Sequence, residues 1–251
     1  MVFDFYEGFN PYVYGIGVAA PKIISYAASF GYTTSELLSH FDHREDIRDG
    51  ISKMAAVGVR DSNTMKLVKE LVPAATTVKT IDPVLLYGFS DEAKKWGKPG
   101  DFGKPYILIY SYSFNMDSRS EVAAIRKLAN DLGCVLVSVG YWHPWCDFNV
   151  NADPEQFVRL FADASYVITD TFHGTVFSLI FEKQFRTIIR KNSFKVRDLL
   201  EDLSASSFIA ASPLEIESAA SHAIDYGPVI ERLSELRERS GKFLLEQVGE
   251  L

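Results

Sequence analysis

Apolar strand-like runs alternate with helix-like segments in the second half of the chain, and this alternation constrains the fold more than any other feature. Residues 103–110 are short, apolar and β-branched, which is typical of a buried strand. Residues 118–132 repeat apolar side chains at helical spacing, and Gly133 follows as a helix stop. Residues 134–139 are again continuously apolar, which predicts a strand buried on both faces.

The alternation continues to about residue 225. Asp153 begins a helix, since a capping Asp is followed by Pro at the first helical position and by Gln156 three residues after the cap. The segments that follow are predicted as helix 154–162, strand 166–169, helix 174–181, strand 185–189 and helix 194–203. Such an order predicts an α/β fold with a doubly wound parallel sheet.

The first hundred residues are less regular but also contain strand-like runs, at 23–29, 55–59 and 77–80. Thr33 with Glu36 suggests a capping box, and Asp61 or Ser62 is expected to cap the next helix. The polar, glycine-rich stretch 90–102 is interpreted as a linker. We therefore expect one domain over residues 1–100 and a second over 101–251, which includes a terminal helix at 228–251.

Composition excludes several classes of protein. The net charge of −7 argues against a surface for nucleic acid, which requires clustered positive charge. We expect no transmembrane segment, because no apolar run approaches the roughly 18 to 20 residues that span a bilayer. The first residues carry Asp4 and Glu7 and lack the pattern of a signal peptide, and only two cysteines are present. A cytoplasmic location with free thiols is the expectation.

Ligands of open α/β sheets bind beyond the carboxyl ends of the strands, so polar residues at strand ends are candidates for chemistry. After the predicted strand 166–169, His173 opens a helix, where unpaired N–H groups attract phosphates and carboxylates. Gly174 is expected to let a ligand approach the backbone. The alternative is a capping or packing histidine. The predicted binding residues of this turn are Thr169, Asp170, Thr171, Phe172, Gly174 and Thr175.

Three basic residues also follow predicted strands. Arg60 could grip a carboxylate or phosphate, or else form a surface pair with Asp61. Arg190 and Lys191 could attract an anion near His173, or else belong to a solvated basic face. Two further segments, 40–43 and 143–146, hold His with Asp or Cys but lack third and fourth metal ligands, so we predict no metal site.

Four segments in order resemble the polysaccharide pyruvyl transferase family: KIISYAASFG at 22–31, VGVRDSNT at 57–64, IDPVLL at 81–86 and YVITDTFHGTVFSLIFEKQF at 166–185. The resemblance implies two Rossmann-like domains similar to those of GT-B glycosyltransferases, with the first domain on the acceptor side and the second binding the donor. It implies transfer of a pyruvyl group from phosphoenolpyruvate to a saccharide acceptor in exopolysaccharide biosynthesis, as a ketal, without a metal or cofactor. Arg60 and His173 match the donor-site Arg and His of the family.

The sequence also differs from the family pattern in one respect, and two alternative functions remain. Family members usually have a Gly-rich first βα unit and a GSD-type loop before a segment like residues 2–14, so we expect the first domain to be incomplete here. The acceptor could be a cell-surface polysaccharide or its lipid-linked precursor, with peripheral contact to that lipid. The alternatives are a GT-B-type glycosyltransferase that uses a nucleotide sugar and a truncated, non-catalytic remnant.

Overall fold

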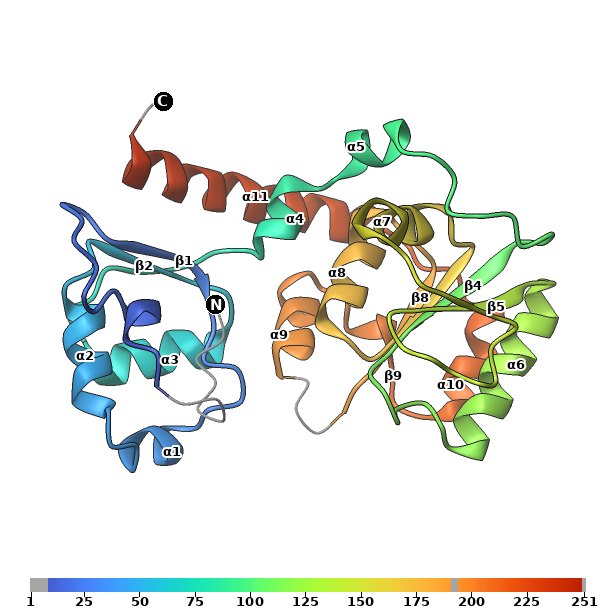
Figure 1. The fold of residues 1–251 in the computed structure, drawn as a ribbon, viewed down its shortest axis with the longest axis horizontal. Coiled ribbons are helices and arrows are strands. Elements are labelled where there is room, and N and C mark those ends of the chain that lie inside the picture. Colours follow the sequence, from blue (N-terminus) through green and yellow to red (C-terminus); the bar gives the residue numbers. More distant parts are fainter. Residues whose placement is uncertain (1–8, 191–193, 250–251) are drawn as a thin grey trace. The chain divides into compact units, whose positions relative to one another are not determined.

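The chain forms two compact units, each built on a parallel sheet (Figure 1). The computed structural model describes residues 9–190 and 194–249. Unit 1 is Met1–Leu86 with Glu231–Leu251, and unit 2 is Tyr87–Ile230. Because every strand pairing is parallel, the predicted α/β class is confirmed. None of the helices in the described ranges has the length and apolarity to cross a membrane.

Unit 1 contains a three-stranded sheet in the order β1-β2-β3, whose middle strand is wholly buried. Helix α3 begins after Asp61, whose carboxylate accepts a hydrogen bond from the Thr64 backbone N–H at 2.8 Å. Helix α1 is capped by Thr34, one residue beyond the predicted Thr33. The elements of this unit are the 3-10 helix η2 (Pro11–Tyr14), β1 (Ile24–Ala28), α1 (Ser35–Ser39), α2 (Arg44–Ser52), β2 (Ala56–Val59), α3 (Ser62–Leu71), β3 (Thr77–Lys79) and the start of α4 (Pro83–Tyr87).

The terminal helix α11 (Gly227–Val248) packs on unit 1 over most of its length, whereas the sequence assigned it to the second domain. The Phe243 ring lies against β2 where Gly58 has no side chain, since a Cβ there would stand 3.0 Å from the ring. The Ser240 hydroxyl accepts a hydrogen bond from the Ile81 N–H at 3.0 Å. The predicted domain boundary was based on the local polarity of residues 90–102. The contacts of α11 join residues far apart in the sequence, so that local signal could not reveal them.

Unit 2 contains a six-stranded sheet in the order β6-β5-β4-β7-β8-β9. The predicted strands at its centre are present, and the short edge strands β6 and β9 were not predicted. Residues expected to be a linker instead begin with helix α5, whose Ala93 carbonyl accepts a hydrogen bond from Arg159 at 2.7 Å. The strands are β4 (Tyr106–Tyr110), β5 (Val135–Val139), β6 (Phe148–Val150), β7 (Tyr166–Thr169), β8 (Phe185–Ile188) and β9 (Ile209–Ala210). The helices are α5 (Ser90–Lys95), α6 (Arg119–Leu132), α7 (Pro154–Asp163), α8 (Phe172–Ile180), α9 (Phe194–Asp202), η3 (Ser206–Phe208), α10 (Pro213–Glu217) and η4 (Ser218–Ser221).

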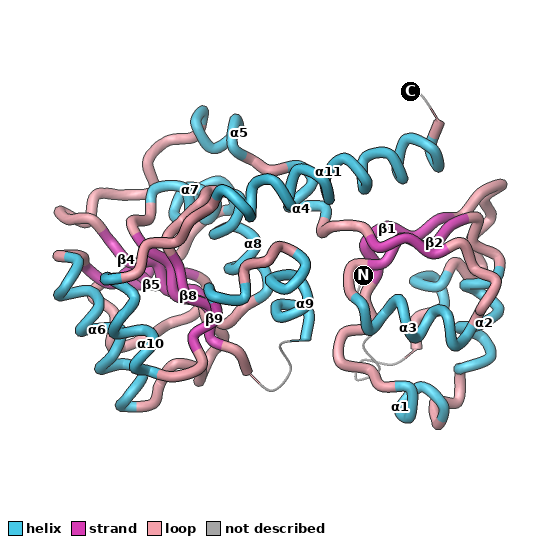
Figure 2. Tube along the Cα trace, turned by 180° about the vertical axis from the view of Figure 1, so that it is seen from behind, coloured by secondary structure: helices cyan, strands magenta, loops and turns pink. Residues whose placement is uncertain are grey.

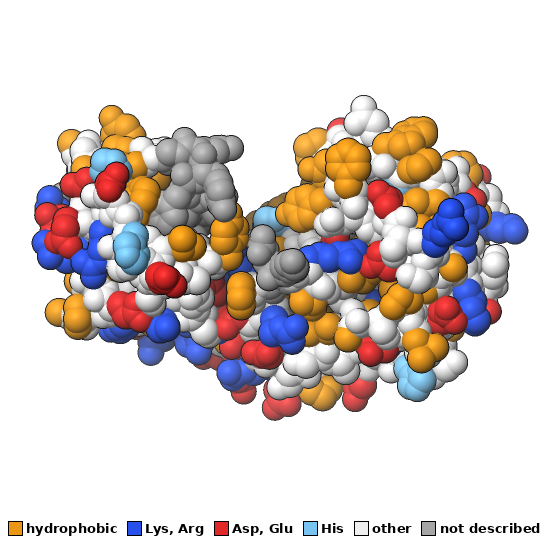
Figure 3. All heavy atoms as spheres, turned by 90° about the horizontal axis from the view of Figure 1, so that it is seen from below, with side chains coloured by type: hydrophobic (Ala, Val, Ile, Leu, Met, Phe, Trp, Pro, Cys, Tyr) orange, Lys and Arg blue, Asp and Glu red, His pale blue; other side chains and the backbone are white. Residues whose placement is uncertain are grey.

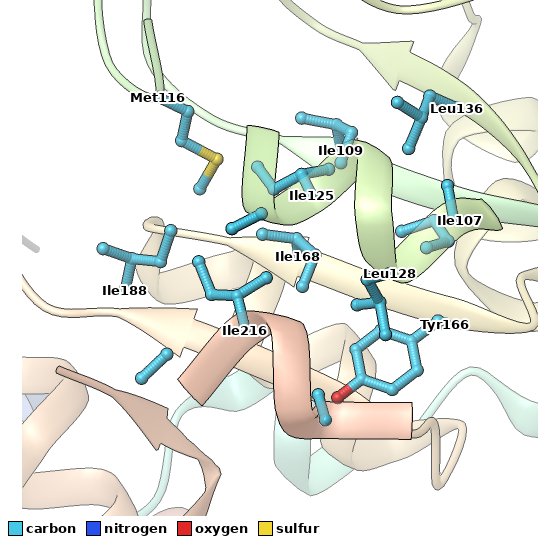
Figure 4. Packing of buried hydrophobic residues seen from close by; sticks show 14 residues of the cluster. Ile107, Ile109, Met116, Ile125, Leu128, Leu136, Tyr166, Ile168, Ile188 and Ile216 are labelled. Carbon is cyan, nitrogen blue, oxygen red and sulfur yellow. The ribbon is translucent and has the colours of Figure 1, made fainter. Parts of the chain in front are cut away.

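Helices cover both faces of this sheet, as the apolar strands predict. Ile107 and Ile109 of β4 face the cluster that α6 and α10 complete, shown in Figure 4. Tyr110 points to the other face, where its ring meets Phe157 and Phe161 of α7. Figure 2 shows the same arrangement of helices around the strands from behind. The capping box of α7, with Asp153 and Gln156, is present as predicted.

Candidate functional site

The turn between β7 and α8 lies at the carboxyl edge of the central strands of unit 2. Strand β7 pairs with β4 on one side and β8 on the other, so residues that follow these three strands share one edge. Thr171 is the N-cap of α8, and its hydroxyl accepts a hydrogen bond from the Gly174 N–H at 2.9 Å. The sequence thus placed the turn correctly.

Three threonines of the turn are buried and bond within it. The Thr169 hydroxyl donates to the Tyr110 carbonyl at 2.6 Å and lies 3.0 Å from the Thr171 hydroxyl. The Thr175 hydroxyl donates to the Thr171 carbonyl at 3.0 Å and lies 2.7 Å from the Thr187 hydroxyl. These residues therefore shape the turn, whereas the sequence suggested that they contact a ligand.

Gly174 has a packing role that the sequence did not reveal. A Cβ at this position would stand 2.1 Å from the Thr169 hydroxyl oxygen and 2.7 Å from that of Thr171. Any larger residue would push α8 away from the turn. The glycine thus lets the helix approach the two hydroxyls, rather than letting a ligand approach the backbone.

His173 is exposed, at the second residue of α8, and so is not a core histidine. Its ring meets the ring of the half-buried Phe172 edge to face, with centroids 5.4 Å apart. The first turn of a helix carries partial positive charge and directs N–H groups outward. An imidazole there can donate to an anion and exchange a proton near neutral pH.

Asp170 and Arg190 form a charged network at the same edge. The Asp170 carboxylate is fully buried and accepts hydrogen bonds from the Asn115 side chain at 2.7 Å and the Tyr112 N–H at 3.4 Å. Arg190 donates to Asp170 from Nε at 3.3 Å and to Glu121 from Nη1 at 2.8 Å. Arg190 thus pairs with two carboxylates, so its positive charge is compensated within the protein.

Sequence reasoning missed Asn115 and Glu121, although both follow the predicted strand that became β4. The available signals were a polar residue soon after a strand, for Asn115, and an acidic residue in the first turn of the next helix, for Glu121. The sequence did not reveal the strand order, which places β4 beside β7. Lys191, the remaining predicted basic residue, lies outside the described residues. Within the described ranges, no three His, Cys, Asp or Glu side chains cluster as metal ligands would.

Arg60 follows β2 in unit 1, where it forms a buried ion pair. Its Nη1 lies 2.5 Å from the Asp82 carboxylate, and the two side chains are 11% and 2% exposed. Its backbone N–H donates to the Ala28 carbonyl at 2.9 Å. Asp61, the predicted surface partner, is instead buried and caps α3. The pair that the sequence proposed as an alternative is therefore replaced by Arg60–Asp82.

Comparison with known families decides the assignment of the chain. The polysaccharide pyruvyl transferase model matches residues 7–192, a range that holds both Arg60 and His173. The chain belongs to the polysaccharide pyruvyl transferase family. A search of curated proteins finds no significant match.

Solved structures show which fold this member of the family shares. Trehalose-6-phosphate synthase OtsA aligns with a TM-score of 0.52 at 9% identity, over 87% of this chain and 65% of its own. The UDP-GlcNAc 2-epimerase from Neisseria meningitidis aligns with a TM-score of 0.53 at 12% identity, over 90% and 70%. MnaA from S. aureus aligns with a TM-score of 0.54 at 13% identity, over 92% and 70%.

These three solved structures have low sequence identity to the chain, so they show the fold alone: two Rossmann-like domains with parallel sheets, as in GT-B glycosyltransferases. The chain spans about two thirds of the length of these structures, between 65% and 70%.

Proposed function

We propose that this chain transfers a pyruvyl group from phosphoenolpyruvate to a saccharide and forms a ketal. The observation that carries the proposal is His173, an exposed imidazole at the start of α8 within the segment that the family model matches. The acceptor that we propose is a sugar of a cell-surface polysaccharide or its lipid-linked precursor. We propose the cytoplasm as its location, with which the free thiols of Cys134 and Cys146 agree.

Phosphoenolpyruvate presents two anionic groups, and the chain offers two kinds of site for them. The N-terminus of α8 suits the phosphate because its N–H groups and partial positive charge favour anions. A guanidinium suits the carboxylate, which it can bind in a bidentate manner. Arg60 is the residue that we propose for this role. Arg60 belongs to unit 1 and His173 to unit 2, so the role proposed for each residue is tested by its own variants.

The chemistry requires two additions to the same carbon of the donor. One sugar hydroxyl oxygen bonds to C2 while C3 gains a proton and becomes a methyl group. A second hydroxyl then bonds to C2, and the C2–O bond to phosphate breaks. Of the two hydroxyl protons released, one balances the proton gained by C3 and the other leaves with inorganic phosphate. We propose His173 as the acid that serves either C3 or the departing phosphate.

Thermal unfolding with added ligands tests the donor. Phosphoenolpyruvate at a hundred times its dissociation constant should stabilise the protein by about 2.7 kcal/mol. UDP and a UDP-sugar form the comparison arms, because two structural neighbours carry UDP-GlcNAc or UDP in their structures. Stabilisation by the nucleotides alone would favour a nucleotide-sugar enzyme. No response to millimolar phosphoenolpyruvate would overturn the proposed donor.

Two variants separate a donor role of Arg60 from its structural role. Arg60→Ala and Asp82→Asn both remove the same buried ion pair, but only the first removes the guanidinium. If Arg60 binds the donor, the response to phosphoenolpyruvate is lost in Arg60→Ala and kept in Asp82→Asn. An equal response in both variants would restrict Arg60 to a structural role.

Ketal formation tests the reaction itself. Incubation with phosphoenolpyruvate and a defined saccharide should release inorganic phosphate and yield an acid-labile pyruvylated product, both detectable by mass spectrometry and a phosphate assay. Binding of the donor without either product would favour the non-catalytic remnant.

A further inference from the structure

We infer that four exposed aromatic side chains of unit 2 bind the saccharide acceptor, an inference that rests on the proposed function and adds contacts beyond the acceptor side that the resemblance implies for the first domain. Tyr112 and Phe114 follow β4, and Tyr141 and Trp142 follow β5; together they are called the aromatic platform. Their exposed fractions are 53%, 92%, 40% and 75%. Figure 3 shows that hydrophobic side chains reach the molecular surface in groups. Grouped exposed apolar side chains mark interaction sites more often than single ones do.

The two loops of the platform lie side by side. Strands β4 and β5 are parallel neighbours, so the segments that follow them leave the same edge of the sheet. The ring centroids of Tyr112 and Tyr141 are 6.1 Å apart. Below them, the Trp145 indole N–H donates to the Asp117 carboxylate at 3.3 Å, which joins the loops a second time. The rings of Tyr112 and Tyr141 thus lie together on two connected loops, and Phe114 and Trp142 extend from the same two loops.

The first loop holds Phe114 outward in a conformation that bulky residues rarely adopt. Phe114 and Met116 have φ values of 63° and 58°. Between them, the Asn115 side chain is bonded to Asp170, and Met116 is buried in the core. The strained backbone at Phe114 is therefore held by the anchors of the two residues that follow it. The Phe114 ring is therefore held in an exposed position, where it is not stabilised by burial in the isolated chain.

The second loop is fixed by hydrogen bonds within and below it. The Ser138 hydroxyl donates to the Tyr141 carbonyl at 2.7 Å. The Asn149 side chain accepts from the His143 N–H at 2.7 Å and donates to the His143 carbonyl at 3.1 Å. Gly140 turns the chain with a φ of 85°, where a Cβ would stand 2.9 Å from the Tyr110 ring. A rigid aromatic surface loses little conformational entropy on binding.

A saccharide fits this surface by chemistry and by position. Aromatic rings present flat apolar faces, which suit the C–H faces of sugar rings, while tyrosine hydroxyls can bond to sugar hydroxyls. The platform is also continuous with the candidate site, because the Tyr112 N–H donates to Asp170, two residues before α8 begins. An acceptor held there would lie along the edge that carries the proposed donor turn.

Binding to a printed array of neutral hexose and N-acetylhexosamine oligosaccharides tests the inference. Phe114→Ala/Trp142→Ala should lose binding to the saccharides that the wild type recognises, by on the order of tenfold or more. Tyr12→Ala and Leu245→Ala are matched controls, since these side chains are 68% and 64% exposed in unit 1 and should leave binding unchanged. The melting temperature of the double variant should equal that of the wild type.

The inference would be overturned if the wild-type protein bound no saccharide on the array, or if the double variant bound saccharides as well as the wild type. It would also be overturned if the wild type formed a dimer that the double variant does not form, while saccharide binding stayed unchanged. The donor is scored separately through thermal stabilisation by phosphoenolpyruvate. A normal donor response without saccharide binding at the platform refutes this inference alone. Saccharide binding through the platform without a donor response refutes the proposed donor and supports the platform.

Discussion

Units 1 and 2 each contain a turn from a buried strand into a helix, and the two turns use their ionisable residue in opposite ways. Asp61 caps α3 in one turn and Thr171 caps α8 in the other, each accepting from the N–H three residues on. Arg60 stands just before its cap and pairs with Asp82 in the interior. His173 stands two residues after its cap and is exposed.

The position relative to the cap explains the difference. A residue before the cap still continues the strand, whose side chains lie against neighbouring segments of the sheet edge. A residue in the first helical turn projects from the helix surface, beside the unpaired N–H groups. The same local motif therefore gives an ion-paired, largely buried guanidinium in one unit and an exposed imidazole in the other. The following substitutions test that contrast.

Replacing His173 should have the largest effect on activity. His173→Asn should lower the rate of ketal formation by on the order of 10²- to 10⁴-fold, because an acid is lost from the reacting groups. Unfolding should be unchanged, since the side chain is exposed. Steady-state kinetics and thermal melts measure both. His222→Asn, at an exposed histidine of the same unit, is the control and should keep full activity. Wild-type rates in His173→Asn would refute the assigned role.

Breaking the ion pair of unit 1 should instead cost stability. Arg60→Ala or Asp82→Asn leaves one buried charge without its partner, which should lower the free energy of unfolding by about 3–5 kcal/mol. Hydrogen exchange followed by mass spectrometry should show faster exchange in β2 and α4. The exposed pair of Arg48 and Glu45 is the comparison, and Arg48→Ala should cost less than about 1 kcal/mol. Equal costs at the two sites would remove the contrast.

Adding a methyl group to the turn of unit 2 should have a smaller effect. Gly174→Ala places a Cβ on the Thr169 hydroxyl and should destabilise the protein by about 1–3 kcal/mol through overpacking. Urea denaturation measures the change. A stability equal to that of the wild type would show that the turn relaxes without cost and that Gly174 is not required for packing.

A glycine-to-alanine substitution in unit 1 should give the smallest change in the free energy of unfolding, and this change should be stabilising. Gly241 lies inside α11, and a Cβ there would meet nothing within 4 Å. Gly241→Ala should therefore stabilise unit 1 by about 0.4–1 kcal/mol through lower chain entropy in the unfolded state. Thermal melts check the direction, and a lower melting temperature would contradict it.

The sequence by itself predicted the central strands, the caps of two helices and the family. The apolar runs of β4, β5 and β7 were predicted to within three residues at each end. The capping residue Asp153 was also predicted, and Asp61 was one of two candidates for the cap of α3, because a cap acts on N–H groups only two or three positions away. His173 could be placed at a helix start for the same reason. Such signals are local, so no knowledge of strand order is needed.

Only the tertiary structure decided which of these residues remain available to a ligand. Arg60 meets Asp82 over 22 positions, Asn115 meets Asp170 over 55, and Arg190 meets Glu121 over 69. Hydroxyl groups that appeared free in the sequence bond inside the turn, and the terminal helix packs on the first sheet. The physical reason is the same for the three long-range pairs. Such contacts form only when parallel pairing brings distant segments to one edge, and no local pattern carries that information.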